Sequence, residues 1–271
     1  MADNRIHEIS IFALDLAMRA GEIVEQERRK NAFERNYKSQ HELVTSADIK
    51  VDEFINKTIR KTYPDHRILS EEVSPQVLQD ESLDTPLWII DPIDGTVNFA
   101  HGHPQVAVSI AYAEKGEVQL GVVHCPFLHE TFHAIKGENA SVNHKHIQVS
   151  QITEIRDALI ATGFPYDKSS TDLLTARVNR VLHSCQDIRR NGSAAIDICW
   201  VACGRLDGYY ESLSPWDFAA ARLIATEAGA TAGHFSEIPE SAHAALYGKD
   251  IIIANPAIYD SLRKVIADDP A

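Results

Sequence analysis

Two aspartates at the end of an apolar segment are the residues of this sequence that point most directly to chemistry. Leu87–Ile90 leads into Asp91-Pro-Ile-Asp94-Gly-Thr96. Two carboxylates at a core edge repel each other and are costly to desolvate, so we interpret them as ligands and not as a surface turn. Gly95 lets the backbone approach a ligand closely, and its N–H and that of Thr96 can bind an anion. Carboxylates beside an anion predict a hard cation such as Mg²⁺ between them.

Further acidic residues fit the same demand for oxygen ligands. Glu71 and Glu72 end a short predicted strand, and Asp48 lies in the first turn of a predicted helix. Asp217 begins a helix rich in small residues. Taken singly, Asp48 and Asp217 are equally explained as charges that stabilise a helix N-terminus.

The overall charge narrows the possible partners. Among 271 residues, 26 Lys and Arg stand against 39 Asp and Glu, for a formal net charge of −13. Such a surface repels nucleic acid and anionic membranes, so we expect direct binding to neither. It also repels a phosphate ester unless bound divalent cations reverse the sign locally.

Other features exclude further classes of protein. No apolar run reaches the ~18 residues of a membrane span, and the N-terminus carries no secretory signal, so we expect a soluble cytoplasmic protein. None of the four cysteines forms a CxxC pair, which argues against a zinc or redox motif. We interpret His124, His129 and His133 as structural.

The elements that must position the acidic residues follow from hydrophobic periodicity. Residues 5–28 predict an amphipathic helix, and Thr45 or Ser46 caps a second one that ends at Tyr63-Pro64. The polar stretch 28–42 between them predicts a loop. Leu87–Ile90 predicts a buried strand that stops at Pro92, which cannot donate to a sheet. Further strands are predicted at 66–69, 106–113, 118–123, 130–135 and 250–254, and further helices at 171–185, 193–204, 216–229 and 256–267.

This pattern changes near residue 150. Residues 1–147 predict an α+β half with a large, mainly antiparallel sheet and the metal-binding motifs. Residues 148–271 predict an α/β half that contributes the substrate pocket and Asp217. No Pro, Gly or Ser-rich linker separates them, so we expect the halves to pack tightly.

Four segments, in this order and spacing, resemble the inositol monophosphatase family, within the wider fructose-1,6-bisphosphatase-like, lithium-sensitive phosphatases. These segments are Leu43–Asp48, Ser70–Glu72, Trp88–Phe99 and Trp216–Ala221. Arg189–Ala195 and Asp207–Glu211 also match family segments that line the substrate pocket. The resemblance implies an α+β fold, a layered sandwich of alternating helix and sheet layers.

The resemblance also implies a role for each matched residue. Glu71, Asp91 and the carbonyl of Ile93 would hold one Mg²⁺, and Asp91, Asp94 and Asp217 a second. Thr96, bonded to Asp48, would orient and help deprotonate the attacking water. Backbone groups of Gly95 and Thr96 would hold the phosphate. Polyol hydroxyls would be contacted by Asp94, Gly192, Ser193, Ala194, Glu211 and Asp217. Lys38 matches a lysine near the metals, in a loop that would close over the site.

By this resemblance, we expect a Mg²⁺-dependent, lithium-sensitive, homodimeric phosphatase that hydrolyses a small polyol phosphate, foremost inositol-1-monophosphate. Two or three metal ions would activate water, with no covalent intermediate. The metal ligands match the family, but Ser212–Ser214 departs from its commoner sequence, which leaves the fine substrate preference open.

Three alternatives stay open. A haloacid-dehalogenase-like phosphatase places its two aspartates two residues apart, on one strand face, whereas Asp91 and Asp94 are three apart. The same architecture also acts on fructose-1,6-bisphosphate, histidinol phosphate, NADP or 3′-phosphoadenosine nucleotides, although Val97-Asn98 replaces the Lys-Glu of many nucleotide-type relatives. Some bacterial relatives instead act as protein partners of the transcription machinery.

Overall fold

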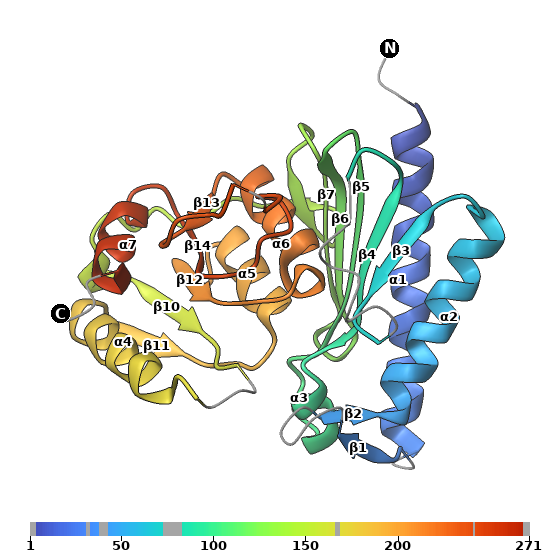
Figure 1. Cartoon of the computed structure of the whole chain (residues 1–271), viewed down its shortest axis with the longest axis horizontal. Coiled ribbons are helices and arrows are strands. Elements are labelled where there is room, and N and C mark those ends of the chain that lie inside the picture. The colour runs from blue at the N-terminus through green and yellow to red at the C-terminus, as the bar shows by residue number, and fades with distance from the viewer. Residues whose placement is uncertain are drawn as a thin grey trace.

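Layers of helix and sheet follow one another along the long axis of the molecule, in the order helix, sheet, helix, sheet, helix (Figure 1). The computed structural model describes residues 4–30, 33–37, 43–72, 83–165, 169–240 and 242–267. The predicted α+β fold of alternating helix and sheet layers is confirmed.

The first sheet has seven strands in the order β3-β4-β5-β6-β7-β8-β9. Only β3 and β4 pair in parallel, and the other neighbours are antiparallel. The strands are β3 (Arg67–Ser70), β4 (Leu87–Asp94), β5 (Ala107–Glu114), β6 (Glu117–Cys125), β7 (Glu130–Ile135), β8 (Ala140–Val142) and β9 (Lys145–His146).

The second sheet has five short strands in the order β11-β10-β12-β14-β13. Strand β10 pairs in parallel with both of its neighbours, and β14 pairs antiparallel with β12 and β13. The strands are β10 (Leu159–Thr162), β11 (Asp187–Arg189), β12 (Gly208–Glu211), β13 (Thr231–His234) and β14 (Ile251–Ala254). A separate two-stranded sheet joins β1 (Arg35–Tyr37) and β2 (Leu43–Thr45).

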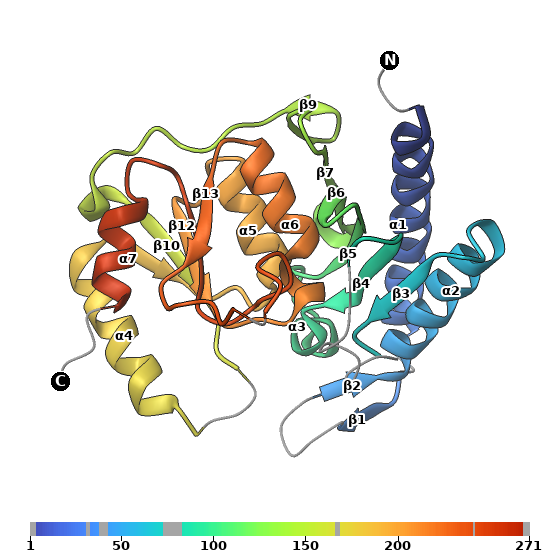
Figure 2. The same ribbon diagram turned by 45° about the horizontal axis from the view of Figure 1, so that its top comes forward.

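Each helix layer covers a sheet face (Figures 1 and 2). Buried apolar side chains fill the space between each layer and its sheet. Helices α1 (Asn4–Lys30) and α2 (Ser46–Thr62) cover the outer face of the seven-stranded sheet. Helices α5 (Ala194–Ala202) and α6 (Pro215–Glu227) lie between the two sheets. Helices α4 (Thr171–Ser184) and α7 (Tyr259–Ala267) cover the far face of the five-stranded sheet. The remaining short helices are α3 (Thr96–His101), η1 (Pro126–Leu128) and η2 (Ile155–Asp157).

The N-terminal helices follow the predicted periodicity. Helix α1 buries residues at helical spacing, among them Ile9, Leu16 and Val24. It runs to Lys30, and Arg35–Tyr37 forms β1, so the expectation of a loop throughout 28–42 is wrong. Lys38 lies outside the described residues, and its proximity to the site stays a prediction.

Strand β4 continues past the proline that was expected to end it. All eight of its residues are buried, and it reaches Asp94. Pairing with β5 holds from Leu87 to Asp91, shifts register, and resumes at Asp94. Proline has no N–H to donate, so the ladder skips Pro92 and Ile93 as a bulge instead of stopping. Bulges commonly redirect side chains next to functional sites.

The chain passes from the first sheet to the second between His146 and Leu159. One apolar core nevertheless joins both sheets, because α5 and α6 fill the space between them. The division into two halves at residue 147 therefore stays a prediction. The two halves share one large apolar core among the described residues.

Candidate active site

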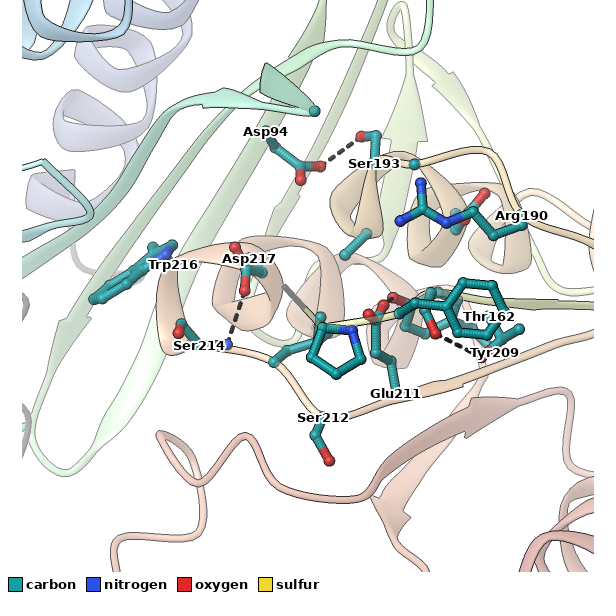
Figure 3. Close-up of a pocket in the computed structure, with 18 of the residues that line it drawn as sticks. Asp94, Thr162, Arg190, Ser193, Tyr209, Glu211, Ser212, Ser214, Trp216 and Asp217 are labelled. Atoms are coloured by element: carbon teal, nitrogen blue, oxygen red, sulfur yellow. Dashed lines mark hydrogen bonds between the residues drawn. The ribbon is translucent and has the colours of Figure 1, made fainter. Parts of the chain in front are cut away.

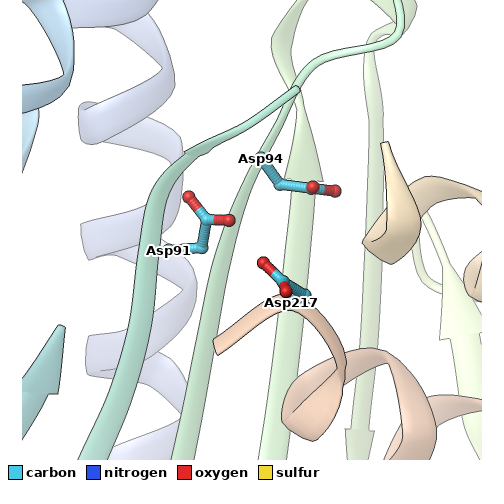
Figure 4. Close-up of side chains that lie close together, drawn as sticks. All are labelled: Asp91, Asp94 and Asp217. Carbon is cyan, nitrogen blue, oxygen red and sulfur yellow. The ribbon is translucent and has the colours of Figure 1, made fainter. Parts of the chain in front are cut away.

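Three aspartates from two distant parts of the chain meet at one point (Figure 4). Asp91 and Asp94 come from β4, and Asp217 comes from the first turn of α6. Each offers one carboxylate oxygen, and these oxygens all lie within 4.8 Å of one another. Asp91 and Asp94 are buried, with exposed fractions of 2% and 7%.

Local hydrogen bonds hold each carboxylate in place. An oxygen of Asp91 accepts from the N–H of Ile93 at 3.0 Å, across the bulge. Asp217 accepts from the N–H of Ser214 at 2.8 Å, in a capping box at the start of α6. Asp94 accepts from the Ser193 hydroxyl at 2.5 Å and from the N–H of Ala195 at 2.8 Å (Figure 3).

The pKa of each of the three aspartates is raised, because burial and nearby negative charges disfavour the ionised carboxylate. Burial, and then the charges of Glu71 and the other aspartates, raise the pKa of Asp91 well above its usual value. Burial and the charge of Asp94 do the same to the pKa of Asp217. Burial raises the pKa of Asp94 to about 6, against the hydrogen bond from Ser193 that lowers it.

This donor set fits a hard divalent cation. It consists only of carboxylate oxygens, which Mg²⁺ and Ca²⁺ prefer, and their mutual repulsion is what a bound cation would relieve. Neutral nitrogen and thiolate ligands, typical of zinc, are not part of the group found among the described residues.

Glu71 stands beside this group without belonging to it. Its N–H donates to the carbonyl of Ile90 at 3.2 Å, which continues the pairing of β3 with β4 beyond Ser70. Its charge raises the pKa of Asp91, Asp94 and Asp217. Glu71 also lines the same cavity as Asp94 and Asp217.

Thr96 and Asp48 form the predicted pair behind the aspartates. The Thr96 hydroxyl lies 3.0 Å from an oxygen of Asp48 and 3.2 Å from the carbonyl of Ile93. The other oxygen of Asp48 accepts from the N–H and the hydroxyl of Thr45, at 2.8 and 2.5 Å, and so caps α2. Burial raises the pKa of Asp48 to about 6, against these hydrogen bonds.

Gly95 joins β4 to α3 in a conformation that favours glycine. Its φ is 95°, and a Cβ there would lie 2.8 Å from the carbonyl oxygen of Gln105. Neither the conformation nor the space suits another residue.

A cavity of about 490 Å³ opens in front of the aspartates, between the two sheets (Figure 3). Except for Thr96, every residue predicted to contact substrate lines it: Asp94, Gly95, Gly192, Ser193, Ala194, Glu211 and Asp217. Thr96 is 5% exposed and bonds to Asp48 instead.

The far wall of the cavity carries residues that the sequence did not single out. Phe164 and Pro165 follow β10, and Lys249 precedes β14. A Cβ at Gly163 would lie 2.0 Å from a carboxylate oxygen of Glu211, so a side chain at position 163 would displace the Glu211 carboxylate.

Two acids lie in the same wall, Asp197, which is buried, and Glu211, which is half-buried. Burial raises the pKa of Glu211 to about 7, although Tyr209, which hydrogen-bonds to it, and the charge of Arg190 lower it. Burial likewise raises the pKa of Asp197 to about 8, while its hydrogen bond from Asn191 at 2.6 Å lowers it. Near neutral pH such groups can both donate and accept hydrogen bonds, as polyol hydroxyls require.

A model of the inositol monophosphatase family matches residues 5–268. The chain belongs to this family. The Nus factor SuhB of Pasteurella multocida is 36% identical over 250 residues, which cover 91% of each chain.

Solved structures of family members have the same fold. The extragenic suppressor protein suhB of Bartonella henselae superposes with a TM-score of 0.87 at 30% identity, over 97% of this chain and 100% of the other. An inositol monophosphatase from Anabaena superposes with a TM-score of 0.83 at 32% identity, over 98% of both chains.

Within the part of the chain that the structure describes, every helix is too short or too polar to cross a membrane.

Proposed function

We propose that this member of the inositol monophosphatase family is a Mg²⁺-dependent phosphomonoesterase acting on a small polyol phosphate, foremost inositol-1-monophosphate. The observation that carries the proposal is the convergence of Asp91, Asp94 and Asp217, of which Asp94 and Asp217 line a cavity of about 490 Å³. A site of this charge repels a phosphate ester unless cations are held there.

Asp91, Asp94 and Asp217, with Glu71 and the carbonyl of Ile93, would hold the metal. When bound, divalent cations supply Lewis-acid polarisation of the phosphate and a water molecule activated at neutral pH. Mg²⁺ is proposed because it prefers oxygen ligands and commonly links one or two carboxylates to a substrate phosphate.

The chain's own residues would supply positioning and proton transfer. Thr96 Oγ1 would take a proton from the attacking water as its own hydroxyl proton moves to the Asp48 carboxylate, 3.0 Å away. The N–H groups of Gly95 and Thr96 would orient the phosphate. Because phosphoryl transfer has a loose transition state, orientation and charge neutralisation suffice, and no aspartyl-phosphate is needed.

The remaining cavity residues would bind the alcohol part of the substrate. Polyol hydroxyls would meet the Glu211 carboxyl, Asp94 and Asp217, together with Gly192, Ser193 and Ala194. Fructose-1,6-bisphosphate, histidinol phosphate, NADP and 3′-phosphoadenosine nucleotides stay alternative substrates. Inhibition by lithium, a homodimer and a cytoplasmic location are further proposals that rest on the family.

A phosphate-release assay over inositol phosphates, sugar phosphates and nucleotides tests this function. We expect turnover with Mg²⁺, none after chelation, and none in an Asp91→Asn variant. Asp15→Asn is the matched control, because Asp15 is exposed on α1 and pairs locally with Arg19. Turnover without a divalent metal, or in the Asp91→Asn variant, would refute the mechanism.

A second candidate function is a role as a protein partner of the transcription machinery. It is favoured by the similarity to a protein named Nus factor SuhB. Replacing the chromosomal copy by the Asp91→Asn variant separates the two functions. An unchanged phenotype would assign the cellular role to protein contacts, whereas a phenotype equal to deletion would assign it to catalysis.

A further inference from the structure

The metal-binding group is divided between two elements that must be held at a fixed separation. Asp91 lies on β4 in the first sheet, whereas Asp217 lies on α6, which follows a strand of the second sheet. The hydrogen bonds of Asp217 and Ser214 fix the carboxylate within its own helix. They do not fix that helix relative to β4.

Ser109 on β5 joins these two elements directly. It is the antiparallel partner of Asp91, and residues directly opposite in such a pair project from the same face of the sheet. The Ser109 hydroxyl donates to the carbonyl of Trp216 at 3.1 Å. Trp216 precedes Asp217 in the first turn of α6 (Figure 3). Ser109 is fully buried, so water does not compete for this bond.

This bond adds to the hydrogen bonds that α6 makes by itself. In an α-helix the carbonyl of residue 216 accepts from the N–H four residues later, and a carbonyl oxygen has a second lone pair. Loss of the Ser109 hydroxyl therefore leaves no buried polar group without a partner. Its contribution is the position of the helix start.

The contacts around Ser109 show which movement it would restrain. Gly121 on β6 lets the backbone of Ala220 approach closely, because a Cβ at Gly121 would lie 2.5 Å from the Ala220 carbonyl oxygen. That contact sets how deeply α6 sits on the sheet one turn after Asp217. A helix held at that contact alone could still tilt or rotate at its first turn.

We propose that Ser109 is a positioning residue, whose hydroxyl fixes the start of α6 so that the Asp217 carboxylate stays within reach of a cation held by Asp91. This inference rests on the proposed function, since it concerns affinity for the metal. A similar link runs in the other direction, because Asp94 on β4 accepts hydrogen bonds from Ser193 and Ala195 at the start of α5. The first sheet would thus position Asp217 through α6, and α5 would position Asp94.

Isothermal titration of Mg²⁺ into Ser109→Ala, with unfolding measured in EDTA, tests the inference. We expect the Mg²⁺ dissociation constant to rise at least about tenfold, as for other groups that orient metal ligands. The melting temperature in EDTA should change little. Ser109→Cys has a side chain of similar size with a weaker hydrogen-bond donor, so its Mg²⁺ dissociation constant should lie between those of the wild type and Ser109→Ala. If Ser109→Ala does not fold, Ser109→Cys provides the test.

Ser10→Ala provides the matched control. Ser10 is also a buried serine that joins a helix to this sheet, since its hydroxyl lies 2.7 Å from Nε2 of His133, but it belongs to α1 on the opposite face. Its loss should leave the affinity for Mg²⁺ unchanged. Wild-type affinity in Ser109→Ala would overturn the inference and leave the proposed function standing. Absence of Mg²⁺ binding by the wild-type protein would overturn both.

Discussion

At the scale of single residues, the candidate site gathers carboxylates that destabilise one another in the absence of a cation. Asp91, Asp94 and Asp217 are brought together although burial and the charges of neighbouring carboxylates raise the pKa of each. Without a cation, the folded protein must keep protons on this group or tolerate the repulsion. Local hydrogen bonds to Asp94 and Asp217 offset only part of that cost.

The Asp91→Asn variant should therefore be more stable than the wild type in EDTA above neutral pH. Because the pKa of Asp91 is higher in the folded state than in the unfolded one, the folded state binds more protons. This contribution to stability is present below about pH 4 and is lost as the pH rises through the folded pKa. We expect the advantage of the variant to grow as the pH rises from 4.5 to 8.

Urea unfolding of both proteins in EDTA at pH 4.5 and pH 8 measures this difference. Buried histidines such as His124, whose pKa is lowered to about 4 by burial, affect both proteins equally and cancel. A stability difference that is constant with pH would show that folding does not raise the pKa of Asp91.

At the scale of elements, the depth of α6 on the first sheet decides where Asp217 lies. Gly121 on β6 makes that depth possible, because the Ala220 backbone occupies the space of a Cβ. A side chain at this position would meet backbone atoms, which cannot rotate away.

Gly121→Ala should destabilise the protein by about 1–3 kcal/mol and weaken Mg²⁺ binding, because it pushes α6 and Asp217 away from β4. Urea unfolding and titration calorimetry measure the two effects. Gly137→Ala is the control: its φ of 82° costs about 1–2 kcal/mol in a residue with a Cβ, but nothing lies within 4 Å of that Cβ. Equal loss of Mg²⁺ affinity in both variants would contradict this explanation.

The elements themselves were predictable where a long pattern exists. Helices α1 and α2 and the apolar core of β4 follow from periodicity, and the Thr45 cap is visible in the sequence. Strands β10 to β13 have three or four residues, too few for an alternating pattern to stand out. The strand predicted at Leu87–Ile90 is too short, because β4 accommodates Pro92 in a bulge and continues to Asp94.

The composition of the site was only partly accessible from local sequence. Asp91 and Asp94 stand out because they follow an apolar strand, but Asp217 by itself is a helix N-terminal charge like many others. Only the resemblance to a family linked it to Asp91. The far wall, with Phe164 and Lys249, was missed because its residues have no common local pattern.

At the scale of the whole molecule, the sheets share one core and one candidate metal centre between them. A ligand that binds only the folded state stabilises all of it. At a free Mg²⁺ concentration one hundred times the dissociation constant, the gain is about 2.7 kcal/mol.

Mg²⁺ should accordingly raise the melting temperature by roughly 5–10 °C in a chain of this size. Scanning calorimetry in EDTA and at increasing Mg²⁺ concentrations measures the shift. Asp91→Asn should show little or no shift, whereas Asp15→Asn should match the wild type. A wild-type melting temperature that is indifferent to Mg²⁺ would argue against a metal centre.

The division of the aspartates along the chain has a consequence for biosynthesis. Asp91 and Asp94 leave the ribosome long before Asp217, and Ser193 and Ala195, which bind Asp94, also come later. A nascent chain that has completed the seven-stranded sheet still lacks α6 and a third aspartate. A cation that needs all three aspartates would therefore bind only when translation is nearly finished, and truncated chains released before residue 217 would carry an incomplete centre.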